Sequence, residues 1–177
     1  NTSAQNQLAL RTGIASTLIP NVMEFEKPPT GRDAYNADVR EALGLDPDEL
    51  LVLQPTRVVQ RKGIEHAIEL VRRIGRKAAL VISHASGDEG YEYQQRVREY
   101  AELLGVRALF DEHVIGDTRG TTPDGNKVYS LQDVYPYADL VTYPSLIEGF
   151  GNAFLEAVYF RKPVLVNNYS IYSHDIK

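Results

Sequence analysis

Four charged side chains that could bind a phosphorylated ligand lie in two loops of this sequence. Arg57 and Lys62 are five residues apart in the first loop, so a planar guanidinium and a mobile ammonium could reach one polyanion together. Glu148 and Glu156 are eight residues apart around the second loop, and a carboxylate can accept hydrogen bonds from two vicinal hydroxyls, such as those of a ribose. These residue types favour a nucleotide site, although the first loop taken alone is also compatible with a solvated cationic turn.

The second loop passes into a predicted helix through residues that suit an anion. These residues are Gly149, Phe150, Gly151 and Asn152. Glycine permits a close approach of the backbone to a ligand, and the free N–H groups at a helix N-terminus favour a phosphate. In the alternative interpretation, the glycines serve only the turn and Glu148 only stabilises the helix dipole. Glu156 lies in the second turn of that helix, too far along it for this alternative.

Regularly alternating elements are predicted to position both loops. Continuous apolar runs are typical of strands covered on both faces, and apolar residues at helical spacing lie between them. Strands are expected at residues 50–53, 78–82, 106–110, 139–143 and 163–166, helices at 64–74, 91–104, 131–138 and 152–160, and a hairpin tip at Asp124-Gly125. Short connections between these elements predict an α/β fold, a Rossmann-like parallel sheet with helices on both faces. Both loops then lie at the carboxyl ends of strands, where such sheets bind ligands.

The first fifty residues have a less regular pattern. We expect a helix that is capped near Thr2 or Ser3 and ended by Gly13, a β-like run at residues 16–21, a linker at residues 24–31 and a second helix that finishes at Gly44. Residues 1–26 are therefore predicted to be the tail of a preceding domain with its linker, and residues 27–177 a ligand-binding domain. Since no helix is expected to cover the last strand, we expect the fold to be truncated at both ends.

Composition narrows the class of protein. The 177 residues are 43% hydrophobic and 24% charged, as in a globular domain. A net charge of −5 argues against a nucleic-acid partner, and the absence of cysteine excludes disulfides, zinc–thiolate sites and thiol nucleophiles. No apolar run reaches the length of a membrane span, and the polar N-terminal residues do not resemble a signal peptide. The expected location is the cytoplasm, with association to a membrane surface left open.

Three motifs occur in the order and spacing of a known family. They are Ile19-Pro20-Asn21, Thr56-Arg57 with Arg61-Lys62-Gly63, and Glu148-Gly149-Phe150-Gly151 with Leu155-Glu156. Together they resemble the retaining GT-B glycosyltransferases of family 4, which use nucleotide-sugar donors, and the last motif matches the family's E-x7-E signature. The resemblance extends over about residues 15–166 and implies the C-terminal, donor-binding domain of such an enzyme. One departure is Val22-Met23, where many members have glycine and a small apolar residue.

The resemblance implies a role for each candidate residue. Arg57 and Lys62 would bind the donor diphosphate and stabilise its charge as it leaves, Glu148 would contact the transferred sugar, and Glu156 would bind the ribose. The backbone from Phe150 to Asn152 would complete the phosphate and sugar site. No metal and no cofactor would be required. The acceptor, a glycan, lipid or small molecule, would bind an N-terminal domain that this sequence lacks, so this fragment alone would be inactive.

Weaker candidates and rival functions remain open at this stage. His84 follows a predicted strand and could approach the ligand or serve as a loop residue. Asp46-Pro47-Asp48 has the letters of a D-x-D metal motif but favours a turn, and Asp111-Glu112-His113 favours a solvated loop because neighbouring strand residues point apart. The rival functions are a non-catalytic sugar-nucleotide binding module, a GT-B sugar-nucleotide epimerase and a dinucleotide-dependent oxidoreductase. The last is disfavoured because the glycine motif lacks its third glycine.

Overall fold

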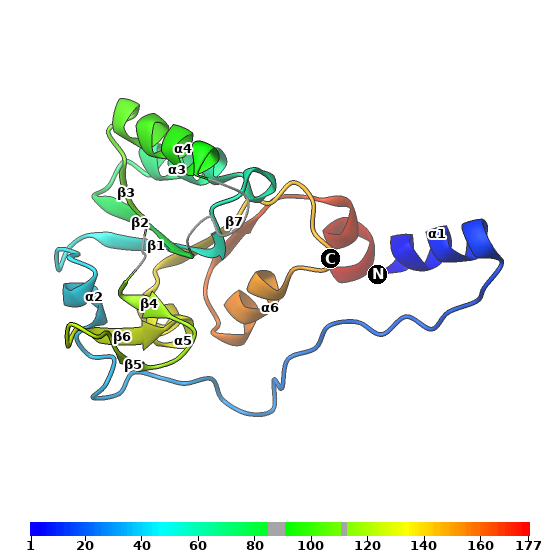
Figure 1. Cartoon of the computed structure of the whole chain (residues 1–177), viewed down its shortest axis with the longest axis horizontal. Coiled ribbons are helices and arrows are strands. Elements are labelled where there is room, and N and C mark those ends of the chain that lie inside the picture. The colour runs from blue at the N-terminus through cyan, green and yellow to red at the C-terminus, as the bar shows by residue number, and fades with distance from the viewer. Residues whose placement is uncertain (85–90, 111–112) are drawn as a thin grey trace.

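A five-stranded parallel sheet forms the centre of the computed structural model, which describes residues 1–84, 91–110 and 113–177 (Figure 1). Across the sheet the strands are β3 (Arg107–Phe110), β2 (Ala78–His84), β1 (Leu50–Arg57), β7 (Leu140–Tyr143) and β8 (Val164–Val166). The chain starts in the middle with β1, adds β2 and β3 on one side, and then crosses over to add β7 and β8 on the other. The winding direction therefore reverses between β1 and β7, and parallel sheets bind ligands beyond such a switch point. The predicted parallel sheet is confirmed, and the two candidate loops follow these two strands.

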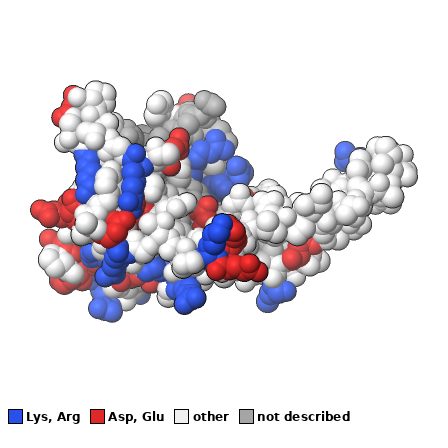
Figure 2. Space-filling view, turned by 90° about the horizontal axis from the view of Figure 1, so that it is seen from below, with Lys and Arg blue, Asp and Glu red and all other residues white. Residues whose placement is uncertain are grey.

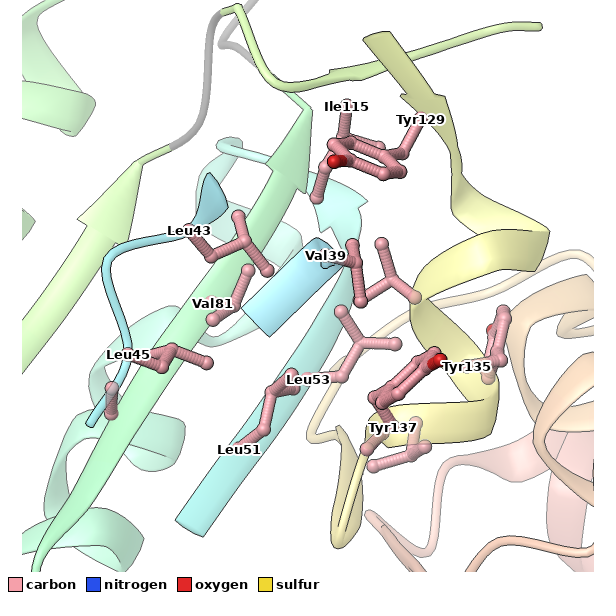
Figure 3. Packing of buried hydrophobic residues seen from close by; sticks show 14 of the residues in the cluster. Val39, Leu43, Leu45, Leu51, Leu53, Val81, Ile115, Tyr129, Tyr135 and Tyr137 are labelled. Atoms are coloured by element: carbon pink, nitrogen blue, oxygen red, sulfur yellow. The ribbon is translucent and has the colours of Figure 1, made fainter. Parts of the chain in front are cut away.

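Helices cover both faces of the sheet, as predicted. One face is covered by α3 (Ile64–Arg73) and α4 (Glu92–Leu103), the other by α2 (Val39–Ala42), α5 (Leu131–Val134) with the 3₁₀ turn η3 (Tyr135–Tyr137), and α6 (Asn152–Tyr159). Side chains alternate along β1, so Leu51 and Leu53 face α5 and α6 whereas Val52 faces α3. Burying a side chain of this size contributes about 1.5–3 kcal/mol. Figure 3 shows Leu51 and Leu53 in the same buried cluster as Tyr135 and Tyr137.

Helix α3 begins directly after the first candidate loop. Its buried side chains recur every three or four residues, at Ile64, Ala67, Ile68 and Val71. This stripe belongs to the same buried cluster as Val52, Leu80 and Ile82 of β1 and β2. Because the helix cannot rotate without exposing the stripe, its packing fixes where the loop ends, at Gly63.

A second, smaller group of strands follows β3 and was only partly predicted. It contains β4 (Ile115–Gly116), β6 (Lys127–Ser130) and β5 (Gly120–Thr121) in that order. β5 and β6 form the antiparallel hairpin expected around Asp124-Gly125, and Gly125 adopts a φ of 86° in its turn. β4 pairs in parallel with β6 and was not predicted, because a two-residue strand shows no periodicity.

The N-terminal segment forms an arm that stands away from the body (Figure 1). Helix α1 (Thr2–Thr12) is capped by Asn1, one residue before the predicted cap, and ends at Gly13 with a φ of 71°. The predicted β-like run at residues 16–21 is wrong: this stretch is exposed and extended, without a strand partner among the described residues. Figure 2 shows basic and acidic side chains interspersed over the body, whereas the arm is nearly free of charge. A domain boundary after residue 26 stays a prediction.

The end of the chain returns to the start of the arm. After β8, a π-helical turn η4 (Tyr172–Ile176) brings the carboxylate of Asp175 to the backbone N–H and hydroxyl of Thr2, so the two termini are adjacent (Figure 1). The second predicted helix is shorter than expected, a single turn of four residues before Gly44. Among the residues described, no helix combines the length and apolar character needed to cross a bilayer.

Candidate functional site

A cavity of ≈ 480 Å³ opens at the carboxyl edge of the sheet, between the loops that follow β1 and β7. Its lining includes eight of the nine residues predicted for the site: Arg57, Lys62, His84, Glu148, Phe150, Gly151, Asn152 and Glu156. The ninth, Gly149, lies beside the cavity rather than in its wall, and its carbonyl accepts a hydrogen bond from Asn1 Nδ2 at 2.6 Å. The fold therefore brings both cations and both carboxylates of the two motifs to one hollow.

Arg57 reaches the cavity from the end of β1. The register between β1 and β2 shifts between Gln54 and Arg57, so that Gln54 pairs with Ile82 while Arg57 pairs with His84. Such a bulge bends a strand and redirects the side chain at its end. Arg57 is exposed and forms no ion pair with the residues that the structure describes. Its guanidinium is therefore available to an anion.

Lys62 and Glu148 connect the two loops through an ion pair. Lys62 Nζ contacts Glu148 Oε1, and the two side chains are only 12% and 9% exposed. Arg61 Nη1 lies 3.6 Å from the other carboxylate oxygen, so Glu148 is placed between two cations. The neighbouring Tyr143 stays a neutral phenol, because burial and the charge of Glu148 both raise its pKa. Arg61 lines the cavity too; the sequence contained it in a motif but suggested no role for it.

Gly63 makes the close contact between the loops possible. Its φ is +62°, and a Cβ on this residue would lie 2.6 Å from the carbonyl oxygen of Pro144. The N–H of Leu146 donates to the carbonyl of Arg61 at 2.9 Å nearby. The spacing between the cations of the first loop and Glu148 of the second is thus set by backbone packing.

The N-terminus of α6 forms another wall of the cavity. Gly151 precedes the helix with a φ of +122°, and a Cβ there would collide with the hydroxyl of Tyr169, which donates to the carbonyl of Phe150 at 2.8 Å. A Cβ on Gly149 would meet nothing within 4 Å, and the φ of this residue lies outside the left-handed region, so its role toward a ligand stays a prediction. Of the two glycines, only Gly151 is required by its backbone geometry. The first helical residues, Asn152 and Ala153, line the same cavity as the cations, so the positive end of the helix dipole lies at this cavity.

Glu156 stands where two cavities meet. It lines the first cavity and also a second one of ≈ 630 Å³, bounded among others by Thr118, Arg119, Leu131 and Tyr135. Burial raises the pKa of Glu156, and the hydroxyl of Tyr135, which donates to Oε2 at 2.9 Å, opposes that effect. Sequence reasoning missed the second cavity, since its walls come from separate segments with no motif of their own.

The remaining candidates are placed as follows. His84 ends β2 at the cavity, with its Nδ1 2.6 Å from Ser83 Oγ. Asp46 and Asp48 both lie within ion-pair distance of Lys77, in a turn that precedes β1 at the opposite edge of the sheet, as expected of a simple turn. Asp111 and Glu112 lie outside the described residues. Within the described ranges, no three His, Asp or Glu side chains gather as a metal site would require.

Residues 36–177 match the family model described as "Glycosyl transferases group 1". The chain belongs to this family. The mannosylglucosylglycerate synthase of Petrotoga mobilis is 34% identical over 196 residues, covering 99% of this chain and 44% of the relative. The enzyme of the same name from Thermotoga maritima is 35% identical, covering 100% and 43%. The group 1 chain described here thus spans less than half the length of these curated relatives.

Solved structures show the same fold at low identity. Anabaena Alr3699/HepE in complex with UDP-glucose superposes with a TM-score of 0.77 at 17% identity, covering 100% of this chain and 46% of that one. The C-terminal domain of a group 1 glycosyl transferase, LpcC from Francisella tularensis, superposes with a TM-score of 0.62 at 16% identity and covers 88% and 75%. The predicted GT-B C-terminal fold and the resemblance to family 4 are confirmed.

Proposed function

We propose that this chain is the donor-binding domain of a retaining glycosyltransferase, which moves a hexosyl group from a nucleotide-diphosphate sugar to an acceptor. The observation that carries the proposal is the convergence of Arg57, Lys62, Glu148 and Glu156 on one cavity at the sheet's switch point. The N-terminus of α6 completes that cavity. The two cations and the helix N-terminus match the negative charge of the diphosphate, and the two carboxylates can accept hydrogen bonds from hydroxyls of the sugar and the ribose.

Arg57 and Lys62 bind the diphosphate in this proposal. When the bond between the anomeric carbon and the phosphate oxygen breaks, negative charge grows on the leaving diphosphate and oxocarbenium character grows on the sugar. Fixed cations and backbone N–H groups stabilise that leaving charge without reorganisation. Because these groups neutralise the diphosphate, the proposed reaction needs no metal ion.

Glu148 changes partners when the donor binds. Without ligand its carboxylate neutralises Lys62. A diphosphate carries more negative charge than a carboxylate and competes for the ammonium, which frees an oxygen of Glu148 to accept hydrogen bonds from sugar hydroxyls. Arg61, on the other side of the carboxylate, keeps Glu148 in place during this exchange.

The ribose and the base extend from the first cavity into the second. In a nucleotide sugar the ribose lies between the diphosphate and the base, and Glu156 lies between the two cavities. We therefore assign the ribose to Glu156 and the base to the second cavity. Leu131, which lines both cavities, offers the base an apolar contact.

Titration calorimetry of the folded chain with ADP, GDP, UDP and pyrophosphate tests the proposal. We expect weak binding of at least one nucleoside diphosphate, tighter than that of pyrophosphate because ribose and base add contacts. We also expect no sugar transfer by this chain alone, because an acceptor must be oriented by the rest of a longer protein. A chain shown to be folded that binds none of the four ligands would contradict the assignment.

Alanine variants separate the roles within the site. Hydrogen bonds to charged groups contribute about 1.5–3 kcal/mol, so Glu156→Ala is expected to weaken nucleoside diphosphate binding by roughly 10- to 100-fold and to leave pyrophosphate binding unchanged. Arg57→Ala and Lys62→Ala should weaken both ligands. Arg72→Ala, an exposed arginine on α3 away from the cavity, is the control. An equal loss of pyrophosphate binding in Glu156→Ala would show that the ribose assignment is wrong.

A further inference from the structure

Tyr135 donates a hydrogen bond to the carboxylate of Glu156. The phenol is 1% exposed, and its hydroxyl lies 2.9 Å from Glu156 Oε2. We propose that Tyr135 is a positioning residue, whose hydroxyl fixes the carboxylate of Glu156 for the ribose. The inference rests on the proposed function, because it requires that Glu156 bind the ribose.

The position of the hydroxyl is set by the core. The ring of Tyr135 stacks on Phe160 with centroids 4.6 Å apart and planes 4° apart. Phe160 follows Glu156 by four residues, so both lie on the same side of α6. The phenol therefore contacts the α6 segment at two points one helical turn apart, through its ring and through its hydroxyl. Tyr135 also belongs to the buried cluster of Leu51 and Leu53 (Figure 3), which leaves the ring little freedom to move.

In this arrangement the two carboxylate oxygens of Glu156 have different roles. Oε2 accepts from Tyr135, whereas Oε1 accepts no hydrogen bond from the described part of the chain and remains available to ribose hydroxyls. The phenol is a dependable donor, because burial and the charge of Glu156 raise the pKa of Tyr135 far above its usual value. A hydrogen bond to an ionised carboxylate also favours its charged form, which opposes the effect of burial on the pKa of Glu156.

Other charged groups face Glu156 only across the cavities. The first cavity contributes Arg57, Arg61, Lys62, His84 and Glu148, and the second contributes Asp117 and Arg119. Among the described residues none of these forms a hydrogen bond or ion pair with the carboxylate of Glu156, and only Tyr135 donates to it. The ionisation of Glu156 should therefore respond to the removal of this one hydroxyl.

Tyr135→Phe tests the inference in calorimetric titrations, since it keeps the ring and removes only the hydroxyl. Loss of one hydrogen bond to a charged group should weaken binding of the best nucleoside diphosphate by about tenfold, with pyrophosphate binding within about twofold of the parent. The fall in nucleotide affinity on acidification should begin at a higher pH than in the parent, because Glu156 protonates sooner. Tyr137→Phe is the matched control: it is buried in the same turn, donates to Asn36 at 3.1 Å and lines neither cavity, so both affinities should be unchanged.

Comparison of Glu156→Ala with Tyr135→Phe distinguishes a failure of the ribose assignment from a failure of the positioning role. If Glu156→Ala leaves nucleotide binding unchanged, the ribose assignment fails and this inference fails with it. If Glu156→Ala weakens nucleotide binding while Tyr135→Phe shifts neither the affinity nor the pH profile, only the positioning role is overturned. Adding Tyr135→Phe to Glu156→Gln should cause no further shift of the pH profile. A Tyr135→Phe chain that fails to fold would assign the hydroxyl to stability and would also overturn the inference.

Discussion

Replacing Gly63 by alanine is expected to destabilise the chain by about 2–5 kcal/mol and to reduce nucleotide binding more than tenfold. A non-glycine residue in the left-handed region costs about 1–2 kcal/mol, and overpacking of a tight contact costs about 1–3 kcal/mol more. Gly63 has a φ of +62°, and the new Cβ would lie 2.6 Å from the backbone oxygen of Pro144. A backbone carbonyl cannot swing aside as a side chain can, so the loops must separate and Lys62 must move away from Glu148. Denaturant unfolding and titration calorimetry measure the two effects.

Gly75→Ala is the matched control for this prediction. Gly75 has a φ of +67°, but a Cβ there would meet nothing within 4 Å. The control therefore carries the same backbone strain without the contact between loops, and we expect a loss of only about 1–2 kcal/mol with nucleotide binding unchanged. If Gly63→Ala lost no more stability than Gly75→Ala and bound nucleotide like the parent, the packing of the two loops would not determine the site.

The elements that form the central sheet could be predicted because the order of apolar residues along each segment shows which of its faces are buried. β1 and β2 are covered on both faces, and their apolar runs reflect this directly. The stripe on α3 likewise identified both the helix and its buried face. The motif loops at Arg57 and Glu148 followed from these elements, since a strand's carboxyl end fixes where a loop emerges.

Features that depend on distant segments could not be predicted in the same way. A β-like run at residues 16–21 has the composition of a strand, yet a strand forms only where another strand is in place to pair with it. The second cavity is assembled from segments as far apart in sequence as Met23 and Phe160. The hydrogen bond from Tyr135 to Glu156 and the proximity of Arg61 to Glu148 depend equally on tertiary packing. A tyrosine in an apolar pattern predicts a buried ring, but the pattern does not show which group its hydroxyl contacts.

Asp133→Asn is expected to lower the free energy of unfolding by about 3 kcal/mol, because it leaves part of a buried charge network unpaired. Asp133 is fully buried and accepts hydrogen bonds from Arg119 Nε at 3.0 Å and from the N–H and hydroxyl of Ser130 at 2.9 and 2.8 Å. Arg119 also pairs with Asp33 at 2.7 Å, and its guanidinium lies 4.5 Å from the ring centroid of Tyr35. The network connects the segment before α2, the hairpin and the N-terminus of α5. An asparagine would turn an N–H donor toward groups that are themselves donors.

The pH dependence of this loss follows from the pKa of Asp133. Burial raises that pKa, but the hydrogen bonds from Arg119 and Ser130 outweigh burial, so the pKa lies below its ordinary value. A carboxyl with a lowered pKa stabilises the fold above its unfolded pKa of about 3.9 and loses that contribution as the pH falls through its folded pKa. The difference between parent and Asp133→Asn should therefore be full at pH 7 and shrink below about pH 4. Asp38→Asn, which removes a surface pair with Lys127 at 2.7 Å, should cause a far smaller loss of stability. Equal losses in the two variants, or a difference that does not change with pH, would show that the network does not stabilise the fold through charge.

The same network supports the wall between the two cavities, because α5 carries Leu131 and precedes Tyr135. Asp133→Asn should therefore weaken nucleoside diphosphate binding more than pyrophosphate binding.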